Sequence, residues 1–365
     1  MSTDAFLADP AAAAPALRSA SASRDAMVGN PEEDDRDRKP STLVGEAGQG
    51  SRDRSVSSKH PALVQSSTSI KAPLSIKAVA SDYVQLTKPR IVTMILVTTV
   101  ASSAIAAGGM IPTLDLAWLL AGTGMVAASA GAANQIWERV IDCNMLRTAT
   151  RPLPDRRISV SAATIYTAIL GLFGTAILWF RFGPEPAAAG AATWLLYVLV
   201  YTPMKTRTSH NTSVGAVAGA LPVLIGYTAA GGSVTDWTGW LLFGILAAWQ
   251  YPHFMAIAWL YRRQYAEAGF CMSTTVDPSG RSAGWQSIAG AIAILVCGVA
   301  LCLIPEGVLG GMMASLAIVA ACLPMLKASL RFATSPDDQI ARKLLRSSLL
   351  VLPAVLLVVT VRVLA

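Results

Sequence analysis

Long apolar segments separated by short polar ones make up most of the chain from residue 91 onward. Nine runs of mostly apolar residues cover 91–109, 116–136, 160–181, 187–203, 212–231, 238–260, 285–304, 307–326 and 347–364. A helix needs about 20 apolar residues to cross a hydrocarbon core about 30 Å thick. The pattern therefore predicts an all-α, polytopic membrane protein with nine transmembrane helices. Runs rich in Gly, Ala and Ser, such as 121–133, allow close helix packing in lipid.

Basic residues are concentrated in alternate polar segments. Segments 137–159, 204–211, 261–284 and 327–346 carry five, two, three and five Lys and Arg residues. The loops on the opposite side are short and carry acidic residues, namely Asp115, Glu185, Asp236 and Glu306. Because Lys and Arg near membrane helices remain on the cytoplasmic side, the pattern predicts a cytoplasmic N-terminus. It also places every polar candidate described below on that same side.

The first 80 residues differ from the rest. They hold 10 basic and 10 acidic residues, few aromatics, and an acidic cluster from Glu32 to Asp35. Such a composition does not bury a core, so we expect residues 1–80 to be a disordered cytoplasmic tail and 81–365 an intramembrane domain. The tail lacks the apolar segment of a secretory signal and is too acidic for a typical mitochondrial transit peptide. A bacterial inner membrane is the expected location, with a mitochondrial inner membrane as the alternative.

Composition supports a location in lipid. The 365 residues are 53% hydrophobic and 14% charged, with a mean hydropathy of +0.49. Soluble domains usually carry about 25% charged residues. The net charge of +7 arises between apolar segments, which excludes the basic patch of a nucleic-acid-binding domain. The five cysteines show no paired spacing, so neither a disulfide framework nor a zinc site is indicated.

Oxygen-bearing side chains recur every four residues where the second run ends. Asn134, Glu138 and Asp142 follow an i, i+4, i+8 spacing, which places all three on one face of a helix. Two carboxylates and an amide are hard oxygen ligands of the kind that Mg²⁺ prefers. The alternative is a solvated helix end whose acids pair with Arg139 or Arg147. Ionisable groups at a membrane boundary favour a functional site, and Asn134 lies a turn deeper in the apolar run.

Basic side chains follow the acidic ones. Arg147 and Arg151 are four residues apart, and Pro152 is expected to end their helix. Lys205 and Arg207 follow the fourth run. Guanidinium groups bind phosphate oxygens well, so acid and base together indicate a diphosphate site at the membrane surface. Ordinary positive-inside charge is the alternative for the second pair.

A third polar group ends the sixth run. Pro252 lies within apolar sequence, where it is expected to kink or break the helix. His253 follows it as a core histidine, a contact to porphyrin iron, or a proton acceptor. Tyr261 to Tyr265 then form an aromatic and basic segment.

Several motifs from about Leu86 to the C-terminus together resemble a known family. They are Leu86-Thr-Lys-Pro-Arg90, Asn134-x₃-Glu138-x₃-Asp142, Arg147-Thr-x-x-Arg151-Pro-Leu-Pro, Tyr201-Thr-Pro-x-Lys205, Asn211 with Gly215, Gly219 and Pro222, Pro252-His253-Phe254, and Gly269-Phe-Cys-Met272. With them the chain resembles the UbiA-type intramembrane prenyltransferase superfamily. The resemblance implies nine helices in a bundle around a central cavity.

The resemblance extends to the branch of that superfamily that uses haem. It implies farnesyl transfer from farnesyl diphosphate to a vinyl group of haem b, giving haem O and diphosphate, with Mg²⁺ as cofactor and haem b as a substrate. The metal ligands it implies are Asn134, Glu138 and Asp142, and the catalytic residues add Arg147 and Lys205. The substrate-binding residues it implies are Arg151, Arg207, Tyr201, His253, Asn211 and Tyr265. The lipid bilayer, and haem A synthase or cytochrome oxidase assembly factors, are the implied partners.

The chain departs from the superfamily pattern near 262–268. The second acidic motif is expected there, but Gln264 stands at its Asp position. Either one metal ion is lost, or Glu267 or Asp277 replaces the ligand. Two other functions stay open: prenyl transfer to an aromatic acceptor such as a quinone precursor, and small-molecule transport. A transporter, however, would place charges near the bilayer midplane rather than at one face.

Overall fold

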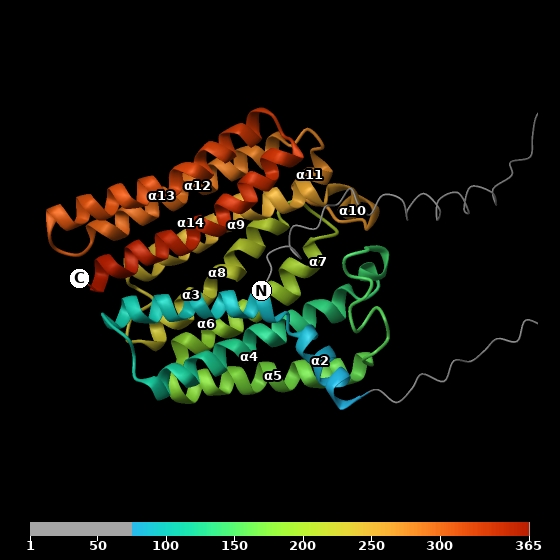
Figure 1. Ribbon diagram of the computed structural model, residues 1–365. Coiled ribbons are helices and arrows are strands. Elements are labelled where there is room, and N and C mark those ends of the chain that lie inside the picture. The colour runs from blue at the N-terminus through green and yellow to red at the C-terminus, as the bar shows by residue number, and fades with distance from the viewer. Residues whose placement is uncertain (1–74, 365) are drawn as a thin grey trace, which may run out of the picture. The chain divides into compact units, whose positions relative to one another are not determined.

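A computed structural model of the protein describes residues 75–364, and every regular element within them is helical (Figure 1). The α-helices are α2 (Ile76–Leu86), α3 (Pro89–Ala107), α4 (Thr113–Glu138), α5 (Val160–Phe182), α6 (Pro184–Leu195), α7 (Thr202–Met204), α8 (Asn211–Ala229), α9 (Trp237–Leu260), α10 (Arg262–Glu267), α11 (Ser273–Val276), α12 (Arg281–Leu303), α13 (Val308–Thr334) and α14 (Asp338–Leu364). A 3₁₀ helix spans Ile141–Asn144, and a π-helical segment spans Leu196–Tyr201 between α6 and α7.

Nine helical stretches among residues 75–364 are long and apolar enough to cross a membrane, which confirms the predicted fold class. The ends of the last two differ from the prediction. Helix α13 continues to Thr334 and α14 begins at Asp338, so the polar segment expected at 327–346 is mostly helical. Hydropathy shows where the apolar sequence stops, but backbone hydrogen bonding continues each helix beyond that point.

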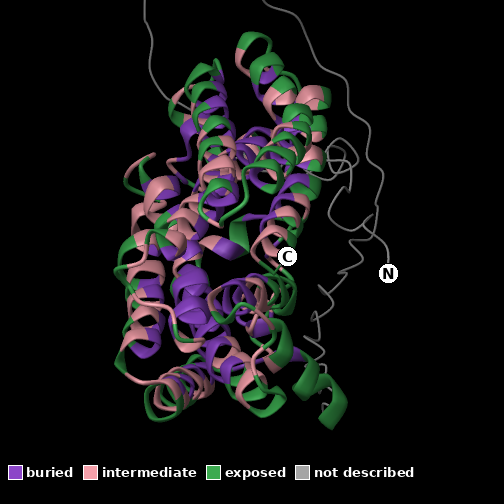
Figure 2. Cartoon of the chain, turned by 90° about the vertical axis from the view of Figure 1, so that its left-hand side faces the viewer, coloured by how far each residue is buried: buried purple, intermediate pink, exposed green. Residues whose placement is uncertain are grey.

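Helices α4, α8 and α9 form the interior of the described bundle. In each of them 61% of the most apolar window is buried, compared with 22% in α5 and α13. Helix α8 packs against α3, α6 and α9, and α4 packs against α3 and α5. Buried residues accordingly gather on the inner helices in Figure 2, whereas the outer helices are largely exposed. Residues on α4, α8 and α9 are thus the ones that the bundle can shield from both lipid and water.

Helix α9 runs from Trp237 to Leu260 without interruption, so the break considered at Pro252 does not occur. A close neighbour accounts for this. Gly290 of α12 lies against the proline, where an added Cβ would be 2.6 Å from the Ala248 carbonyl oxygen and 2.8 Å from Pro252 Cδ. Neighbouring helices of this kind allow proline within membrane helices because they support the locally weakened backbone.

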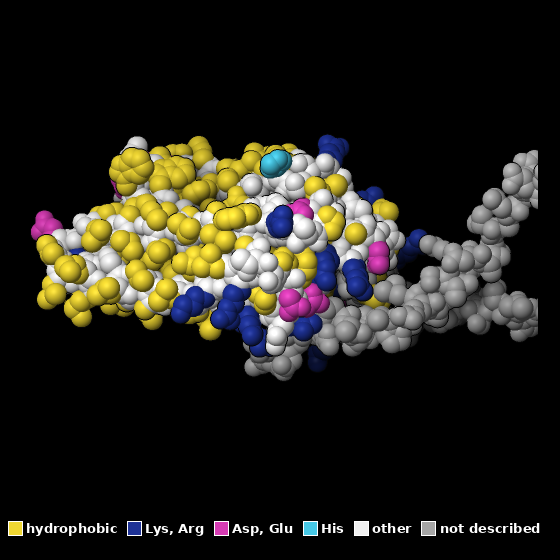
Figure 3. Space-filling model, turned by 90° about the horizontal axis from the view of Figure 1, so that it is seen from above, with side chains coloured by type: hydrophobic (Ala, Val, Ile, Leu, Met, Phe, Trp, Pro, Cys, Tyr) yellow, Lys and Arg dark blue, Asp and Glu magenta, His cyan; other side chains and the backbone are white. Residues whose placement is uncertain are grey.

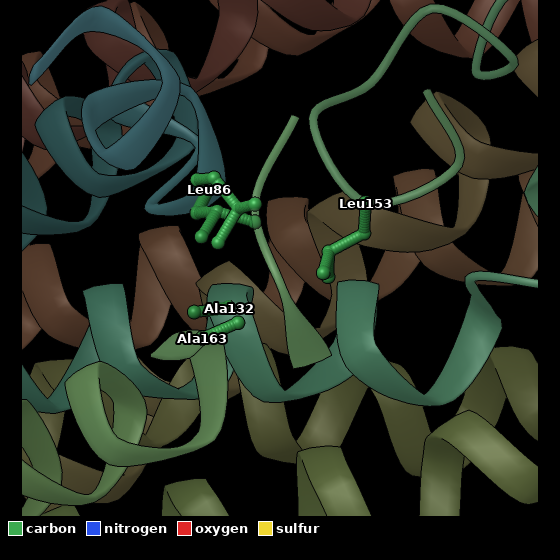
Figure 4. Close-up of a cluster of buried hydrophobic side chains, with 5 residues drawn as sticks. Leu86, Ala132, Leu153 and Ala163 are labelled. Carbon is green, nitrogen blue, oxygen red and sulfur yellow. The ribbon is translucent and has the colours of Figure 1, made fainter. Parts of the chain in front are cut away.

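A small apolar cluster fixes the end of α2 against the bundle. It comprises Leu86, Ala132, Leu153, Ile158 and Ala163, most of them labelled in Figure 4. Helix α2 begins at Ile76, ahead of the predicted boundary at residue 80, and it packs onto α4. The remainder of the predicted tail, residues 1–74, lies outside the described residues.

Basic side chains gather at one end of the described bundle, where α10 and α11 lie (Figures 1 and 3). Hydrophobic side chains cover most of the visible surface between the two ends (Figure 3). At the other end, Arg181 pairs with Asp115 at 2.6 Å. The charge asymmetry expected from the loops is therefore present in three dimensions.

Candidate functional site

The predicted oxygen ligands lie together at the end of α4, but on two elements rather than one. Asn134 and Glu138 lie in the last turns of α4, with 0% and 5% of their surface exposed. The helix ends at Glu138, and Asp142, with 0% exposed, lies on the following 3₁₀ helix. The expectation of one helix reaching Pro152 is therefore wrong.

Local side-chain contacts replace the missing helical turns. The Thr148 hydroxyl donates to the Asp142 carbonyl oxygen at 3.0 Å. The Arg151 guanidinium folds back to the Asp142 carboxylate, with Nη1 2.7 Å from Oδ2. The other carboxylate oxygen, Oδ1, is buried and has no hydrogen-bond partner in the described structure. A buried acceptor without a partner is costly, so this oxygen is available to a cation.

Glu138 pairs with a lysine from a distant part of the chain. Lys205, directly after α7, places its ammonium nitrogen 2.7 Å from Glu138 Oε1 and 4.7 Å from the centroid of the Tyr201 ring. Burial has the largest single effect and alone would lower the pKa of Lys205, but the Glu138 carboxylate together with Tyr201 and Tyr197 outweighs it and raises that pKa above its ordinary value. Tyr201 ends the π-helical segment, a distortion that is frequent at functional sites.

Asn134 is held by two further residues. Its amide nitrogen donates to the Thr202 hydroxyl at 3.0 Å, and its Oδ1 accepts a hydrogen bond of 2.5 Å from the Lys88 ammonium group. Burial lowers the pKa of Lys88. Lys88 is the site residue that sequence reasoning missed, although it belongs to the motif Leu86-Thr-Lys-Pro-Arg90. Its position one residue before the first apolar helix was the available signal.

The chemistry of the oxygen donors fits a divalent ion. They are two carboxylates and one amide oxygen, and one carboxylate oxygen, Asp142 Oδ1, has no partner; Mg²⁺ prefers donors of this kind. Within residues 75–364 there is no cluster of three or more His, Cys, Asp or Glu side chains able to hold a metal. The Asp277 carboxylate instead accepts hydrogen bonds from the Ser279 hydroxyl and from the backbone N–H groups of Ser282 and Ser279, and these bonds lower its pKa. Glu267 is exposed on α10.

Three other predicted residues are exposed or half-buried. Arg147 is exposed, with its guanidinium carbon 5.0 Å from the centroid of the Tyr261 ring. Arg207 is exposed as well. Tyr265 packs edge-on against Phe270, with ring centroids 5.8 Å apart. None of the three has a described contact with the buried carboxylates.

Asn211 and His253 are buried in structural contacts. The Asn211 amide donates to the backbone carbonyl oxygens of Thr208 at 2.7 Å and Cys271 at 2.9 Å, and so fastens two loops together. His253 Nδ1 lies 3.0 Å from the Ser348 hydroxyl of α14, and its ring stacks on Trp249 with centroids 4.6 Å apart. These contacts occupy Nδ1 and one face of the ring, and none of them involves the α4 cluster.

A cavity of about 580 Å³ lies elsewhere, among α8, α9 and α12. Its lining includes His210, Tyr251 and Gln286, and it includes none of the residues predicted from sequence. The candidate site is therefore defined by its buried charges and not by this cavity.

Comparison with known proteins gives a consistent result. The model of the UbiA prenyltransferase family matches residues 95–350. The chain is 61% identical over 283 residues to a protoheme IX farnesyltransferase of Rhodopirellula baltica, covering 76% of this chain and 99% of that protein. It is 39% identical over 286 residues to a protoheme IX farnesyltransferase of Solibacter usitatus, covering 75% of this chain and 96% of that protein.

Solved structures share the fold at low sequence identity. A structure of digeranylgeranylglyceryl phosphate synthase is 16% identical with a TM-score of 0.64, covering 78% of this chain and 98% of that one. A UbiA homologue from Archaeoglobus fulgidus bound to GPP and Mg²⁺ is 16% identical with a TM-score of 0.57, covering 76% of this chain and 99% of that one.

Proposed function

The chain belongs to the UbiA prenyltransferase family, and from this premise we propose that it transfers a farnesyl group from farnesyl diphosphate to a vinyl group of haem b. The new C–C bond leaves a cation on the former vinyl group, which takes up hydroxide from a water molecule as a proton is released. The products are haem O and diphosphate. The observation that carries this proposal is the buried set of Asn134, Glu138 and Asp142 facing Lys88, Lys205 and Arg151. The 61% identity to a protoheme IX farnesyltransferase supports the choice of haem as acceptor.

The site residues have distinct roles in the proposed reaction. Breaking the allylic C–O bond of the donor leaves an allylic cation and a diphosphate on which negative charge develops. Asn134, Glu138 and Asp142 would hold Mg²⁺, which when bound supplies Lewis-acid stabilisation of the leaving group. Lys205 and Arg151 contribute positive charge next to these oxygens, already fixed in place by ion pairs of 2.7 Å. Preorganised charges of this kind need little rearrangement as the bond breaks.

The surrounding residues complete the proposed site. Arg147 and Arg207 are exposed and free to take up the outer diphosphate oxygens. Tyr201 and Tyr265 contribute aromatic walls, and Asn211 fixes the loops between them. The apolar bundle takes the isoprenoid chain and keeps water from the allylic cation. His253 orients haem from within α9, with Ser348 holding its other ring nitrogen.

We place this chemistry at the cytoplasmic face of a bacterial inner membrane. The N-terminus then lies in the cytoplasm, since basic side chains gather at the end of the bundle that carries the site (Figure 3). Haem A synthase or cytochrome oxidase assembly factors are the proposed neighbours, because one of them must receive an apolar haem product.

Product analysis tests the proposal directly. Purified protein in detergent is incubated with haem b, farnesyl diphosphate and Mg²⁺, and the porphyrin is then analysed by mass spectrometry. We expect a porphyrin whose mass has increased by one farnesyl and one hydroxyl group, and no such product when farnesyl diphosphate is omitted. A parallel reaction offers an aromatic acid in place of haem. Prenylation of the aromatic acid with an unchanged porphyrin would overturn the choice of acceptor.

A further inference from the structure

Lys88 reaches the metal ligands from a strained and firmly held stretch of backbone. Its φ and ψ are 55° and 60°, a left-handed conformation that is unfavourable for a residue with a Cβ. Residues in such conformations persist only where the surroundings determine them, and they concentrate at functional sites.

Neighbouring residues hold the backbone of Lys88 in this conformation. The Gln135 amide donates to the carbonyl oxygens of Gln85 at 3.2 Å and Leu86 at 2.9 Å, so α4 holds the end of α2. Gly131, one turn earlier on α4, lets the chain approach so closely that an added Cβ would be 3.1 Å from the Thr87 carbonyl oxygen. The backbone before Pro89 is therefore fixed to the same helix that carries Asn134, and the side chain of Lys88 is the part left to move.

Each proposed metal ligand is already paired with a cation. Lys88 binds the amide oxygen of Asn134, Lys205 binds Glu138, and Arg151 binds Asp142. Three cations thus face two carboxylates, which leaves one net positive charge in a buried site. A divalent cation entering alone would meet repulsion from this excess, whereas a diphosphate ester carries the negative charge that offsets it.

The three cations differ in how firmly they are held. Lys205 and Arg151 form ion pairs with full carboxylate charges, but Lys88 has only a neutral amide as its hydrogen-bond acceptor. The Tyr197 ring lies 6.0 Å from its nitrogen, at the limit of a cation–π contact. Lys88 is therefore the cation that a metal ion displaces most easily.

Building on the proposed function, we infer that Lys88 is a positioning residue that occupies the Asn134 oxygen until metal and diphosphate arrive together. Asn134 would then offer its oxygen to the metal ion, and the Lys88 ammonium would move to the diphosphate. Binding of the two ligands is coupled through this exchange. Since such coupling is reciprocal, each ligand strengthens the binding of the other by the same factor.

Metal binding without turnover tests the inference. Mn²⁺ serves as a spectroscopic substitute for Mg²⁺, and free Mn²⁺ is measured by electron paramagnetic resonance with and without inorganic diphosphate. Wild-type protein is compared with Lys88→Met and with Arg90→Met, a control that removes an exposed cation two residues away. A hydrogen bond to a charged group is worth about 1.5–3 kcal/mol, so we expect Lys88→Met to bind Mn²⁺ roughly tenfold to hundredfold more tightly without diphosphate.

Although Lys88→Met should tighten Mn²⁺ binding alone, it should weaken the coupling between Mn²⁺ and diphosphate. Diphosphate strengthens Mn²⁺ binding strongly in the wild type and in Arg90→Met, and much less in Lys88→Met. Equal or weaker Mn²⁺ binding by Lys88→Met without diphosphate overturns the inference. Lys88→Gln is measured alongside, because its neutral amide can keep a hydrogen bond to Asn134 if the Met variant is poorly folded. The measurement involves neither haem nor a farnesyl chain, so a different acceptor would leave its outcome unchanged.

Discussion

Replacing Asp142 with asparagine tests the part of the site on which the proposed chemistry most depends. Asp142 is fully buried, with Oδ2 2.7 Å from Arg151 and Oδ1 without a partner. Asparagine keeps the size and one acceptor for Arg151. It also removes the negative charge and can turn an N–H donor toward the space where a cation would bind. Metal binding should therefore fall more than folding stability does.

The expected loss of catalysis and the expected loss of folding stability differ in size. Loss of one preorganised group that stabilises developing charge typically lowers kcat by about 10²–10³-fold, or about 2.7–4 kcal/mol in the barrier. The hydrogen bond to Arg151 has one charged partner left, and the Arg151 side chain is 22% exposed. We therefore expect the free energy of unfolding to fall by only about 1–2 kcal/mol.

The assay is farnesyl transfer to haem b, followed by mass analysis of the porphyrin across a range of Mg²⁺ concentrations. Asp155→Asn is the matched control, because it makes the same change in an exposed acid that pairs with Arg157 in the same loop. The control should retain wild-type transfer. Transfer by Asp142→Asn within threefold of wild type, with unchanged dependence on Mg²⁺, would refute the role given to this carboxylate.

Four further outcomes are expected. Lys205→Met leaves the buried Glu138 charge unpaired and should lower the free energy of unfolding, measured by thermal unfolding, by about 3 kcal/mol. The double variant Lys205→Met with Glu138→Gln should recover most of this loss. Losses that simply add in the double variant would contradict the pairing. Gly290→Ala places a Cβ 2.6 Å from the Ala248 carbonyl oxygen and should lower the free energy of unfolding by about 1–3 kcal/mol in thermal unfolding. No change in stability would show that α12 and α9 are less tightly packed. Asp277→Ala removes the acceptor of the Ser282 N–H in the first turn of α12, which should cost about 1 kcal/mol while Mn²⁺ affinity stays unchanged. Weaker Mn²⁺ binding would instead make Asp277 a ligand. His253→Ala should weaken haem binding, followed by the Soret band; unchanged haem affinity and turnover would leave His253 a packing residue.

Sequence was sufficient for the features that depend on local composition. Nine apolar runs predict nine helices because the length of a membrane span is set by the thickness of the hydrocarbon. The spacing of Asn134, Glu138 and Asp142 indicated a polar site, and all three are buried at or just after the end of α4. The pairing of Arg151 with Asp142 was not predicted, because the sequence offered Arg139 or Arg147 as partners of the acids and assigned Arg151 to the diphosphate. Helix ends were less well predicted, since Thr148 and Arg151 stop the helix through side-chain contacts that hydropathy does not register.

Only the tertiary structure decided which cation meets which oxygen. Lys88 and Asn134 are separated by 46 residues, and Lys205 and Glu138 by 67, so their contacts depend on how α2, α4 and α7 pack. The left-handed backbone at Lys88 arises from that packing, through Gln135 and Gly131, and no local sequence rule gives it to a lysine. The direction of His253 toward Ser348 likewise depends on where α14 lies against α9. Periodicity fixes the face of a helix, but the partner of that face is set by the three-dimensional arrangement of the whole bundle.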